Sequence, residues 1–348
     1  EISNPNYYTL GTVELAGNKL TMGEGGGLTI ADPLAMAAAG SEIETRNSDL
    51  TLSSELLLSA GTITSTGGTL TFTDGLTSVG EGTMSVLDST LSVSQSLNFI
   101  SASFESSVLD LQGATTLTSN GTVSFKKVNL NGNVLTLGSA ATHFVLTGPN
   151  ETLNLDNLAL ETGEGSLTIA GALKLQNGAE LNSSGGTITL ESENSDHFVE
   201  SGSLFSIPDT ALITNNYLSF YGSTLKTKNT TFTTRDGFGV AIDTGSILEV
   251  EGNQNITGLH LDDSSTLRLA ADTELENDNW MSIGTLELAD FTLKWDDTMS
   301  KLSVEQAVTL DAATEHIISG NADLLLNGGI TVSNGTLSST GGTLSASS

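Results

Sequence analysis

The residues with the most chemical potential in this chain are acidic. Of its 348 residues, 41 are Asp or Glu. Carboxylates lie close together at Asp262-Asp263, at Asp296-Asp297 and in the run Glu274-Leu275-Glu276-Asn277-Asp278-Asn279. Two carboxylates that flank a sugar linkage are the machinery of a glycoside hydrolase. In so acidic a chain neighbouring carboxylates also arise by chance, and we interpret these pairs as solvated turns.

The run from residue 274 to 279 has a second use, which is cation binding. Ca²⁺ takes six to eight oxygen ligands from carboxylates, carbonyls and water. Glu274, Glu276 and Asp278 are therefore the candidate Ca²⁺ ligands. Their spacing matches neither the EF-hand loop nor the Gly-Gly-x-Gly-x-Asp nonapeptide. We expect no required cofactor, with Ca²⁺ as the possible exception, either at this run or spread along the acidic surface.

Aromatic residues concentrate between residues 191 and 240, where seven of the chain's 17 lie. The two tyrosines of this region are the better surface candidates, because a phenol hydroxyl prefers water. Three basic residues accompany them, which suggests a platform for stacking sugars; the alternative is that the phenylalanines pack in the core. The predicted ligand-binding residues are Tyr217, Tyr221, Lys226, Lys228 and Arg235.

The motifs of other enzyme classes are missing from the sequence. There is no cysteine, no Gly-x-Ser-x-Gly and no His-Glu-x-x-His, and the four histidines stand in unrelated contexts. Nucleophilic catalysis needs a base beside the nucleophile, and a catalytic zinc site needs clustered ligands. We therefore expect the chain not to be an enzyme. A polysaccharide lyase or glycoside hydrolase remains the alternative.

The charge balance limits the partners. The 11 basic residues leave a formal net charge of −30, which repels the phosphates of DNA and RNA. Such acidity also suits divalent cations, and adaptation to a saline habitat would produce it too. No stretch approaches 18 consecutive apolar residues, so we expect no membrane insertion in this segment. From charge and hydropathy we therefore expect no nucleic acid partner and no membrane insertion in this segment.

The elements that must position these residues are short β-strands. Alternation of apolar and polar residues recurs along the chain, as in Asp49-Leu50-Thr51-Leu52, Thr69-Leu70-Thr71-Phe72 and Thr187-Ile188-Thr189-Leu190. A period of two places the apolar side chains on one face and the Thr, Ser and Asn side chains in water. Glycine-rich pieces between the strands supply the positive φ that tight corners need. The pattern predicts an all-β chain.

Internal repeats favour a solenoid over a sandwich. Gly67-Gly68-Thr69-Leu70-Thr71 returns as Gly341-Gly342-Thr343-Leu344-Ser345. The apolar anchors Leu50, Leu70, Leu91 and Leu109 are 20, 21 and 18 residues apart, although the interval falls to 14 between Leu153 and Leu167. Periods of this size are typical of stacked coils. We predict a right-handed parallel β-helix of about 20 residues per coil and roughly 17 coils; a β-roll or two β-sandwich domains are the alternatives.

Three features depart from the simple array. Residues 32–40, Asp-Pro-Leu-Ala-Met-Ala-Ala-Ala-Gly, carry the signals of a short helix with Asp as N-cap and Gly as stop. Residues 191–240 predict wider or decorated coils within one solenoid of residues 1–348. The sequence ends in mid-repeat, which suggests either a fragment of a longer repetitive protein or end-to-end assembly of copies.

The Gly-Gly-Thr-Leu-Thr corners and the run Asn-Leu-Asn-Gly-Asn-Val-Leu-Thr-Leu at residues 129–137 resemble secreted bacterial β-solenoid adhesins. Autotransporter passengers and filamentous-haemagglutinin-like exoproteins are the nearest group. The likeness covers nearly the whole chain in composition and repeat texture. It implies display at the cell surface and adhesive, biofilm or structural roles, with glycans or other surface molecules as partners. A phage-type fibre is a further possibility.

Overall fold

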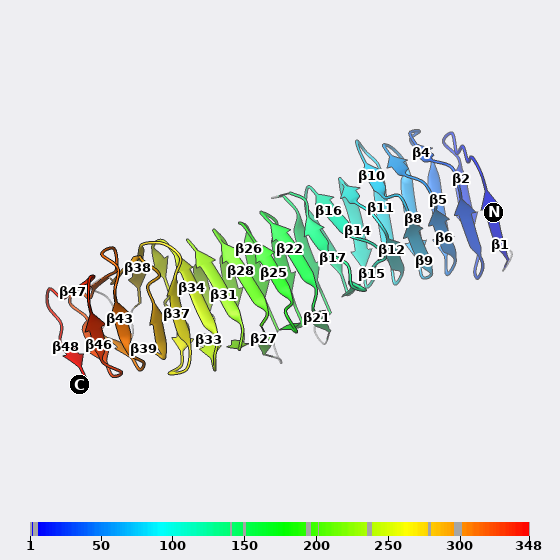
Figure 1. Cartoon of the computed structure of the whole chain (residues 1–348). Helices are drawn as coiled ribbons and strands as arrows, with labels where there is room; N and C mark the ends of the chain where they lie inside the picture. The colour runs from blue at the N-terminus through cyan, green and yellow to red at the C-terminus, as the bar shows by residue number, and fades with distance from the viewer. Residues whose placement is uncertain are drawn as a thin grey trace. The chain divides into compact units, whose positions relative to one another are not determined.

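The chain is an all-β parallel solenoid of about 15 turns, with about 21 residues in each turn. The computed structural model describes residue 2 and residues 6–139, 141–148, 151–192, 196–200, 202–234, 239–277, 280–295 and 301–347. It divides into two compact units, residues 1–153 with 158–171 and residues 154–157 with 172–348. Figure 1 labels many of the strands of both units.

The first unit is built from strands that pair with the strand one turn later, so that each sheet runs along the stack. One sheet contains β1 (Tyr7–Leu10), β3 (Gly27–Ile30), β6 (Asp49–Leu52), β9 (Thr69–Phe72), β12 (Thr90–Val93), β15 (Val108–Leu111) and β18 (Lys127–Asn129). A second contains β2 (Lys19–Met22), β5 (Glu42–Arg46), β8 (Thr62–Thr66), β11 (Thr83–Leu87) and β14 (Ser101–Glu105). The other sheet strands of this unit are β4 (Leu34–Met36), β7 (Leu56–Leu58), β10 (Leu76–Ser78), β13 (Leu97–Phe99), β16 (Thr115–Ser119), β19 (Leu135–Leu137) and β22 (Ala159–Gly163), and separately β17 (Thr122–Phe125), β20 (His143–Leu146) and β23 (Ser166–Ile169).

The second unit repeats this plan. One sheet contains β21 (Thr152–Asp156), β24 (Ala172–Gln176), β27 (His197–Glu200), β30 (Leu218–Tyr221), β33 (Val240–Asp243) and β36 (Leu259–Leu261). Its neighbours along the chain are β25 (Glu180–Ser183), β28 (Leu204–Pro208), β31 (Thr224–Lys228), β34 (Ile247–Glu251), β37 (Thr266–Leu269) and β40 (Thr285–Glu287), and separately β26 (Thr187–Leu190), β29 (Ala211–Thr214) and β32 (Thr231–Thr234). The later turns form three further sheets. One contains β35 (Gln254–Asn255), β38 (Thr273–Glu276), β41 (Thr292–Trp295), β44 (His316–Ile318) and β47 (Thr336–Ser338). The second contains β39 (Trp280–Ile283), β42 (Lys301–Val304), β45 (Asp323–Leu326) and β48 (Leu344–Ala346), and the third pairs β43 (Val308–Leu310) with β46 (Ile330–Val332).

The predicted period of two is the actual burial pattern. Leu70 and Phe72 of β9 point inward and are about 1% exposed. Thr69 and Thr71, which alternate with them, are half-buried on the outer face. Ile188 and Leu190 are likewise fully buried. Leu344, expected to point inward as well, is in register with buried Leu324 but is 46% exposed, because its strand β48 lies at the edge of its sheet.

The anchor spacing read from the sequence is the register of the turns. Leu50 pairs with Leu70, Leu70 with Leu91, and Leu91 with Leu109, so the intervals of 20, 21 and 18 residues are true turn lengths. The interval of 14 between Leu153 and Leu167 is not a turn, because Leu167 pairs with Phe144 in another sheet. Over the whole chain the turns average about 21 residues and number about 15, so they are slightly longer and fewer than predicted.

Buried hydroxyls lie near the ends of strands β5 and β8 and just after β11, where the chain turns a corner. Thr45 donates from Oγ1 to Ser65 Oγ at 2.9 Å, and Ser65 Oγ lies 3.0 Å from Ser89 Oγ in the next turn. The chain turns at this corner through a residue with positive φ, as at Asn47 and Asp88. A buried hydroxyl is stabilised when it finds a partner, and here the neighbouring turn supplies it: Ser65 is in register with Thr45, and Ser89 lies three residues beyond Val86, the register partner of Ser65. The buried hydroxyls at this corner thus satisfy one another's hydrogen bonds.

The helix predicted for residues 32–40 is wrong. Leu34–Met36 is strand β4, which pairs with β7 so that Leu34 faces Leu56 and Met36 faces Leu58. Leu34 and Met36 are buried, and Ala35 between them is exposed. A single helical turn is expensive to nucleate, and a helix could not supply hydrogen bonds to the open edge of β7. Pairing with the neighbouring turn therefore overrides the local capping signals.

Four phenylalanines stack in the core of the first unit. The rings of Phe104 and Phe125 are nearly parallel, with centroids 4.6 Å apart. Phe99 meets Phe104 edge to face at 60°, and Phe144 is tilted by 38° against Phe125. Each belongs to a different turn or strand, so the stack links successive turns through side chains as well as backbone. No helix in the described residues is long and apolar enough to span a membrane.

Substituting Leu70 with Asp tests the inward face. The carboxylate would be buried between Leu50 and Leu91, so we expect a loss of several kcal/mol in the free energy of unfolding. The matched control is Thr71→Asp, one residue along on the outer face, which should cost less than about 1 kcal/mol. Urea unfolding followed by circular dichroism measures both. Equal stabilities for the two variants would show that the face is wrongly assigned.

Candidate functional site

The two predicted tyrosines lie on the outer surface of the second unit. Tyr221 is the last residue of β30, and Tyr217 directly precedes that strand. They are 41% and 45% exposed. Phe205 and Phe220 from the same region are fully buried and pack with ring centroids 6.0 Å apart. The region between residues 191 and 240 thus divides its aromatic residues between core and surface.

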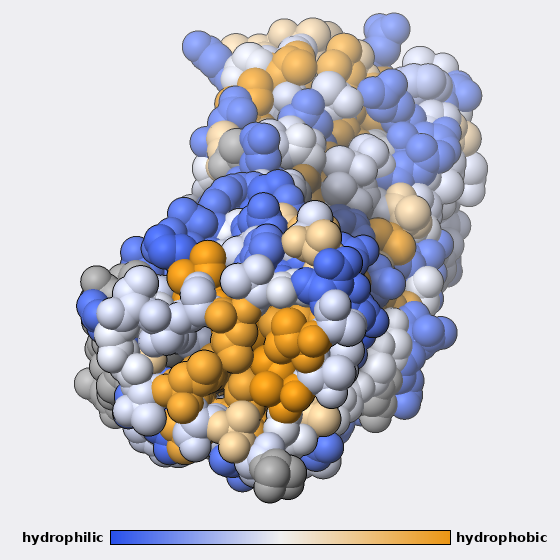
Figure 2. Space-filling view, turned by 60° about the vertical axis from the view of Figure 1, so that its left-hand side comes forward, coloured by the Kyte–Doolittle hydropathy of each residue, from blue (hydrophilic) through white to orange (hydrophobic). Residues whose placement is uncertain are grey.

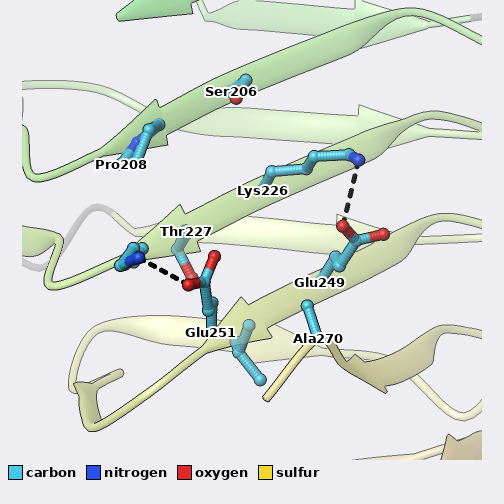
Figure 3. Close-up of a pocket in the computed structure, with 9 residues that line it drawn as sticks. Ser206, Pro208, Lys226, Thr227, Glu249, Glu251 and Ala270 are labelled. Atoms are coloured by element: carbon cyan, nitrogen blue, oxygen red, sulfur yellow. Dashed lines mark hydrogen bonds and ion pairs between the residues drawn. The ribbon is translucent and has the colours of Figure 1, made fainter. Parts of the chain in front are cut away.

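The predicted lysines lie on a different strand and sheet. Lys226 and Lys228 belong to β31, after the corner at Gly222 and Ser223. Lys226 Nζ is 3.0 Å from Glu249 Oε1, and Lys228 Nζ is 2.5 Å from Glu251 Oε1, both on β34 (Figure 3). These side chains line a shallow surface cavity of about 200 Å³ together with Ser206, Pro208 and Ala270. Arg235 lies outside the described residues.

The Lys226–Glu249 pair is part of a longer row of alternating charge. Glu249 Oε2 lies 3.6 Å from Arg268 Nη1 in the following turn, and Arg268 Nε lies 2.6 Å from Glu287 Oε2 in the turn after that. The strand register places all four residues opposite one another. Opposite charges at facing positions of adjacent strands are mildly stabilising. Both lysines thus have intramolecular partners, which makes them poor candidates for binding a ligand charge.

Two of the three predicted Ca²⁺ ligands lie among the residues that the structure describes. Glu274 and Glu276 point outward from β38, and Asp278 lies outside the described residues, as does the Asp296-Asp297 pair. Glu274 Oε1 is 2.7 Å from Lys294 Nζ, and Glu276 accepts a hydrogen bond from Asn255. Within the part of the chain that the structure describes, no three His, Asp or Glu side chains cluster as metal ligands would. Glu274 and Glu276 are thus engaged with a lysine and an amide.

A second set of surface residues was not found from the sequence. The outward side chains of β27, β30, β33, β36 and β39 form what we call the aromatic face: Phe198, Ser219, Tyr221, Ala241, Asp243, His260 and Trp280. Trp280 is 61% exposed, and it lines a cavity of about 200 Å³ with His260. The signal was present, because Met281 and Ile283 alternate as inward residues and so place Trp280 outward.

The geometry of the aromatic face is fixed by strand register. Ser219 faces Ala241 and Ala241 faces His260, while Glu200 faces Tyr221 and Tyr221 faces Asp243. The rings of Phe198 and Tyr221 lie 6.4 Å apart, inclined by 28°, which is a stacked arrangement. Two bulky aromatic patches therefore flank a stretch of small side chains.

The carboxylates of Asp243, on the aromatic face, and of nearby Asp262 have different surroundings. Partial burial raises the pKa of Asp243, and the nearby Asp262 carboxylate raises it further, against the opposing effects of His260 and of hydrogen bonding by Tyr221. Asp262 lies in the turn after β36 and accepts hydrogen bonds from the backbone N–H groups of Thr244 and Ser264 at 3.1 and 2.9 Å. The Asp262-Asp263 pair thus lies in a turn, as interpreted from the sequence, and Asp262 is held in one orientation.

A buried histidine supports the aromatic face from below. His197 precedes Phe198 on β27 and is fully buried. Its Nδ1 accepts a hydrogen bond from the Leu173 N–H at 3.1 Å, and its own backbone N–H donates to the Tyr217 carbonyl at 2.8 Å. Burial lowers the pKa of His197 from 6.5 to about 4, since the charged ring would lose its hydration. The imidazole is therefore neutral at pH 7.

Comparison with known proteins adds no family to this description. No known family model matches the chain, and neither a curated protein nor a solved structure shows significant similarity to it.

Replacing His197 with Gln tests the buried imidazole. The native pKa lies below the unfolded value, so the unfolded chain binds a proton first and stability falls as the pH drops from about 6.5 to 4. The loss should reach roughly 3 kcal/mol, because each pKa unit is worth about 1.4 kcal/mol. Gln keeps an acceptor for Leu173 but does not titrate, so this part of the pH dependence should disappear. Urea unfolding of both proteins between pH 8 and 4 measures it; parallel profiles would contradict the assignment.

Proposed function

We propose that the chain is an extracellular scaffold, a stalk or fibre segment displayed at a bacterial surface, that adheres through glycans or other surface molecules. The observation that carries the proposal is the contrast between its outer surfaces. On strands β31, β34, β37 and β40 the charges pair from turn to turn, whereas the aromatic face leaves Tyr221 and Trp280 exposed. A stack of parallel turns is a rigid support on which such a surface can be presented.

The net charge supports a passive, secreted role. A net charge of −30 favours solubility, opposes aggregation and repels the phosphates of nucleic acids. The repeat texture shared with secreted bacterial adhesins agrees with this, as does the core without cysteine, since stacking replaces disulfide bonds. The polar outer positions, largely Thr, Ser and charged residues, suit a protein that is hydrated on all of its side walls.

Adhesion under flow tests the proposal. Beads coated with the 348-residue chain are passed over an array of immobilised polysaccharides and glycoproteins, with albumin-coated beads as control. We expect retention of the coated beads on at least one glycan surface, because exposed aromatic residues supply contact area at low entropic cost.

The same polymers, incubated with the chain and sized by chromatography, test the enzymatic alternative. We expect no change in polymer length, with or without Ca²⁺. Shortening of a polysaccharide would instead support a lyase or hydrolase, and detachment of the beads from every surface would contradict the adhesive role.

Copies of the chain should also associate end to end, which we propose as a second property. Figure 2 shows apolar surface where the C-terminal turns come forward. Val332 of β46 and Leu344 of β48 are 49% and 46% exposed there, and both strands lie at sheet edges. An open parallel edge with apolar side chains beneath it is a template for another parallel turn. The charge of −30 opposes such contact, and salt screens it.

Light scattering of the 348-residue chain across a salt and Ca²⁺ titration measures this association. We expect monomers at low ionic strength and growing linear particles as salt rises. The double variant Val332→Glu with Leu344→Glu should stay monomeric, and Leu57→Glu with Ile100→Glu, which adds the same charge at exposed positions away from the edge strands β1, β46 and β48, serves as control. Monomers at every salt concentration would contradict the proposal.

A further inference from the structure

Trp280 is unusual because the chain leaves it in water. It is 61% exposed, whereas the other tryptophan, Trp295, is 1% exposed in the same unit. Burying an indole ring gains more from the hydrophobic effect than burying almost any other side chain. At its outward position on β39, Trp280 therefore forgoes the stabilisation that burial of its ring would give, whereas a polar residue at the same position would forgo nothing. Exposed aromatic residues of this kind mark binding surfaces.

The aromatic face extends across the strands. From β27, with Phe198, to β39, with Trp280, the strands step through β30, β33 and β36. Four strand spacings amount to roughly 19 Å. Between the Phe198–Tyr221 stack and the His260–Trp280 cavity this path carries the small side chains of Ser219 and Ala241, so the surface there is lower than at the aromatic rings. The shape suits an extended chain lying across the strands.

Polar acceptors line one side of this path. Asp243 and Asp262 belong to successive turns, and Glu200 lies two turns before Asp243 with Tyr221 between them, next to the column of Phe198, Ser219 and His260. Asp262 is held by two backbone N–H groups, and Glu200 lies 3.4 Å from Lys174. Their remaining oxygen lone pairs are available to donors outside the protein. Apolar ring faces beside fixed acceptors are the combination that binds a molecule with both C–H faces and hydroxyl groups.

We propose that the aromatic face binds a neutral polysaccharide, with sugar rings stacked on Tyr221 and Trp280 and sugar hydroxyls donating to Asp243 and Asp262. The electron-rich ring faces attract the C–H face of a pyranose. An anionic polymer is disfavoured by these carboxylates and by the net charge of −30. This inference rests on the proposed adhesive function and names its ligand class and site.

Titration with cellohexaose tests the site, and Trp280 supplies the signal. The chain has two tryptophans, and only Trp280 is exposed, so sugar stacking should change the emission of one indole. We expect saturable binding that Trp280→Ala and Tyr221→Ala each weaken at least tenfold, with calorimetry as the readout for the variant that lacks Trp280. Trp280→Phe should restore part of the affinity, because it keeps a stacking surface.

Matched controls separate the site from general surface effects. Tyr7 is 74% exposed and belongs to the other unit, so Tyr7→Ala should bind cellohexaose as the unmodified chain does. Hexagalacturonate should bind at least tenfold more weakly than cellohexaose, with the difference shrinking as salt is added. Binding that neither Trp280→Ala nor Tyr221→Ala reduces would overturn the proposal, and so would tighter binding of hexagalacturonate or of a lysine-rich peptide.

The bead assay distinguishes failure of this site from failure of the scaffold function. If beads carrying Trp280→Ala are retained as well as beads carrying the unmodified chain, adhesion stands and the aromatic face is not its site. If unmodified beads detach everywhere, the adhesive function itself fails. Unchanged thermal unfolding of Trp280→Ala, expected because the side chain is mostly in water, ensures that lost binding reflects the site.

Discussion

The backbone hydrogen-bond ladder between successive turns governs the position of every side chain in this protein. Each strand pairs in parallel with the strand one turn later, so a side chain that points inward lies over its equivalent in the previous turn. Inward positions must then be apolar, as in the Leu50–Leu70–Leu91 column, or must satisfy one another, as Thr45 and Ser65 do. A polar residue without such a partner would be costly at every turn above and below it.

The same ladder organises the charges on the outside. Because facing residues of adjacent strands lie about 5 Å apart, like charges in one column repel and opposite charges attract. The row from Lys226 through Glu249 and Arg268 to Glu287 uses this spacing to place four charges in alternation. With only 11 basic residues against 41 acidic ones, most columns cannot be balanced in this way. Hydration and dissolved cations must stabilise the rest.

Side chains that depart from these rules point to function more clearly than those that obey them. His197 is buried in the core with a lowered pKa, and it fixes the Leu173 and Tyr217 segments through hydrogen bonds. Trp280 is the reverse case, an apolar side chain left outside. Both lie on strands of the aromatic face, where rigid support beneath and exposed rings above are what a pre-organised binding surface requires.

The sequence by itself determined the class of fold, the inward and outward faces of the strands, and the turn lengths around Leu50, Leu70, Leu91 and Leu109, because these depend on local alternation and repeat spacing. It also allowed Trp280 to be placed outside, through Met281 and Ile283. Only the tertiary structure decided which outward residues meet. It separated Tyr221 from Lys226 by a corner, brought Phe198 against Tyr221 of the adjacent turn, and turned residues 34–36 from the expected helix into a strand. The physical reason is that turn lengths vary by several residues, and each residue gained or lost in a loop changes which partners the hydrogen-bond ladder brings into register.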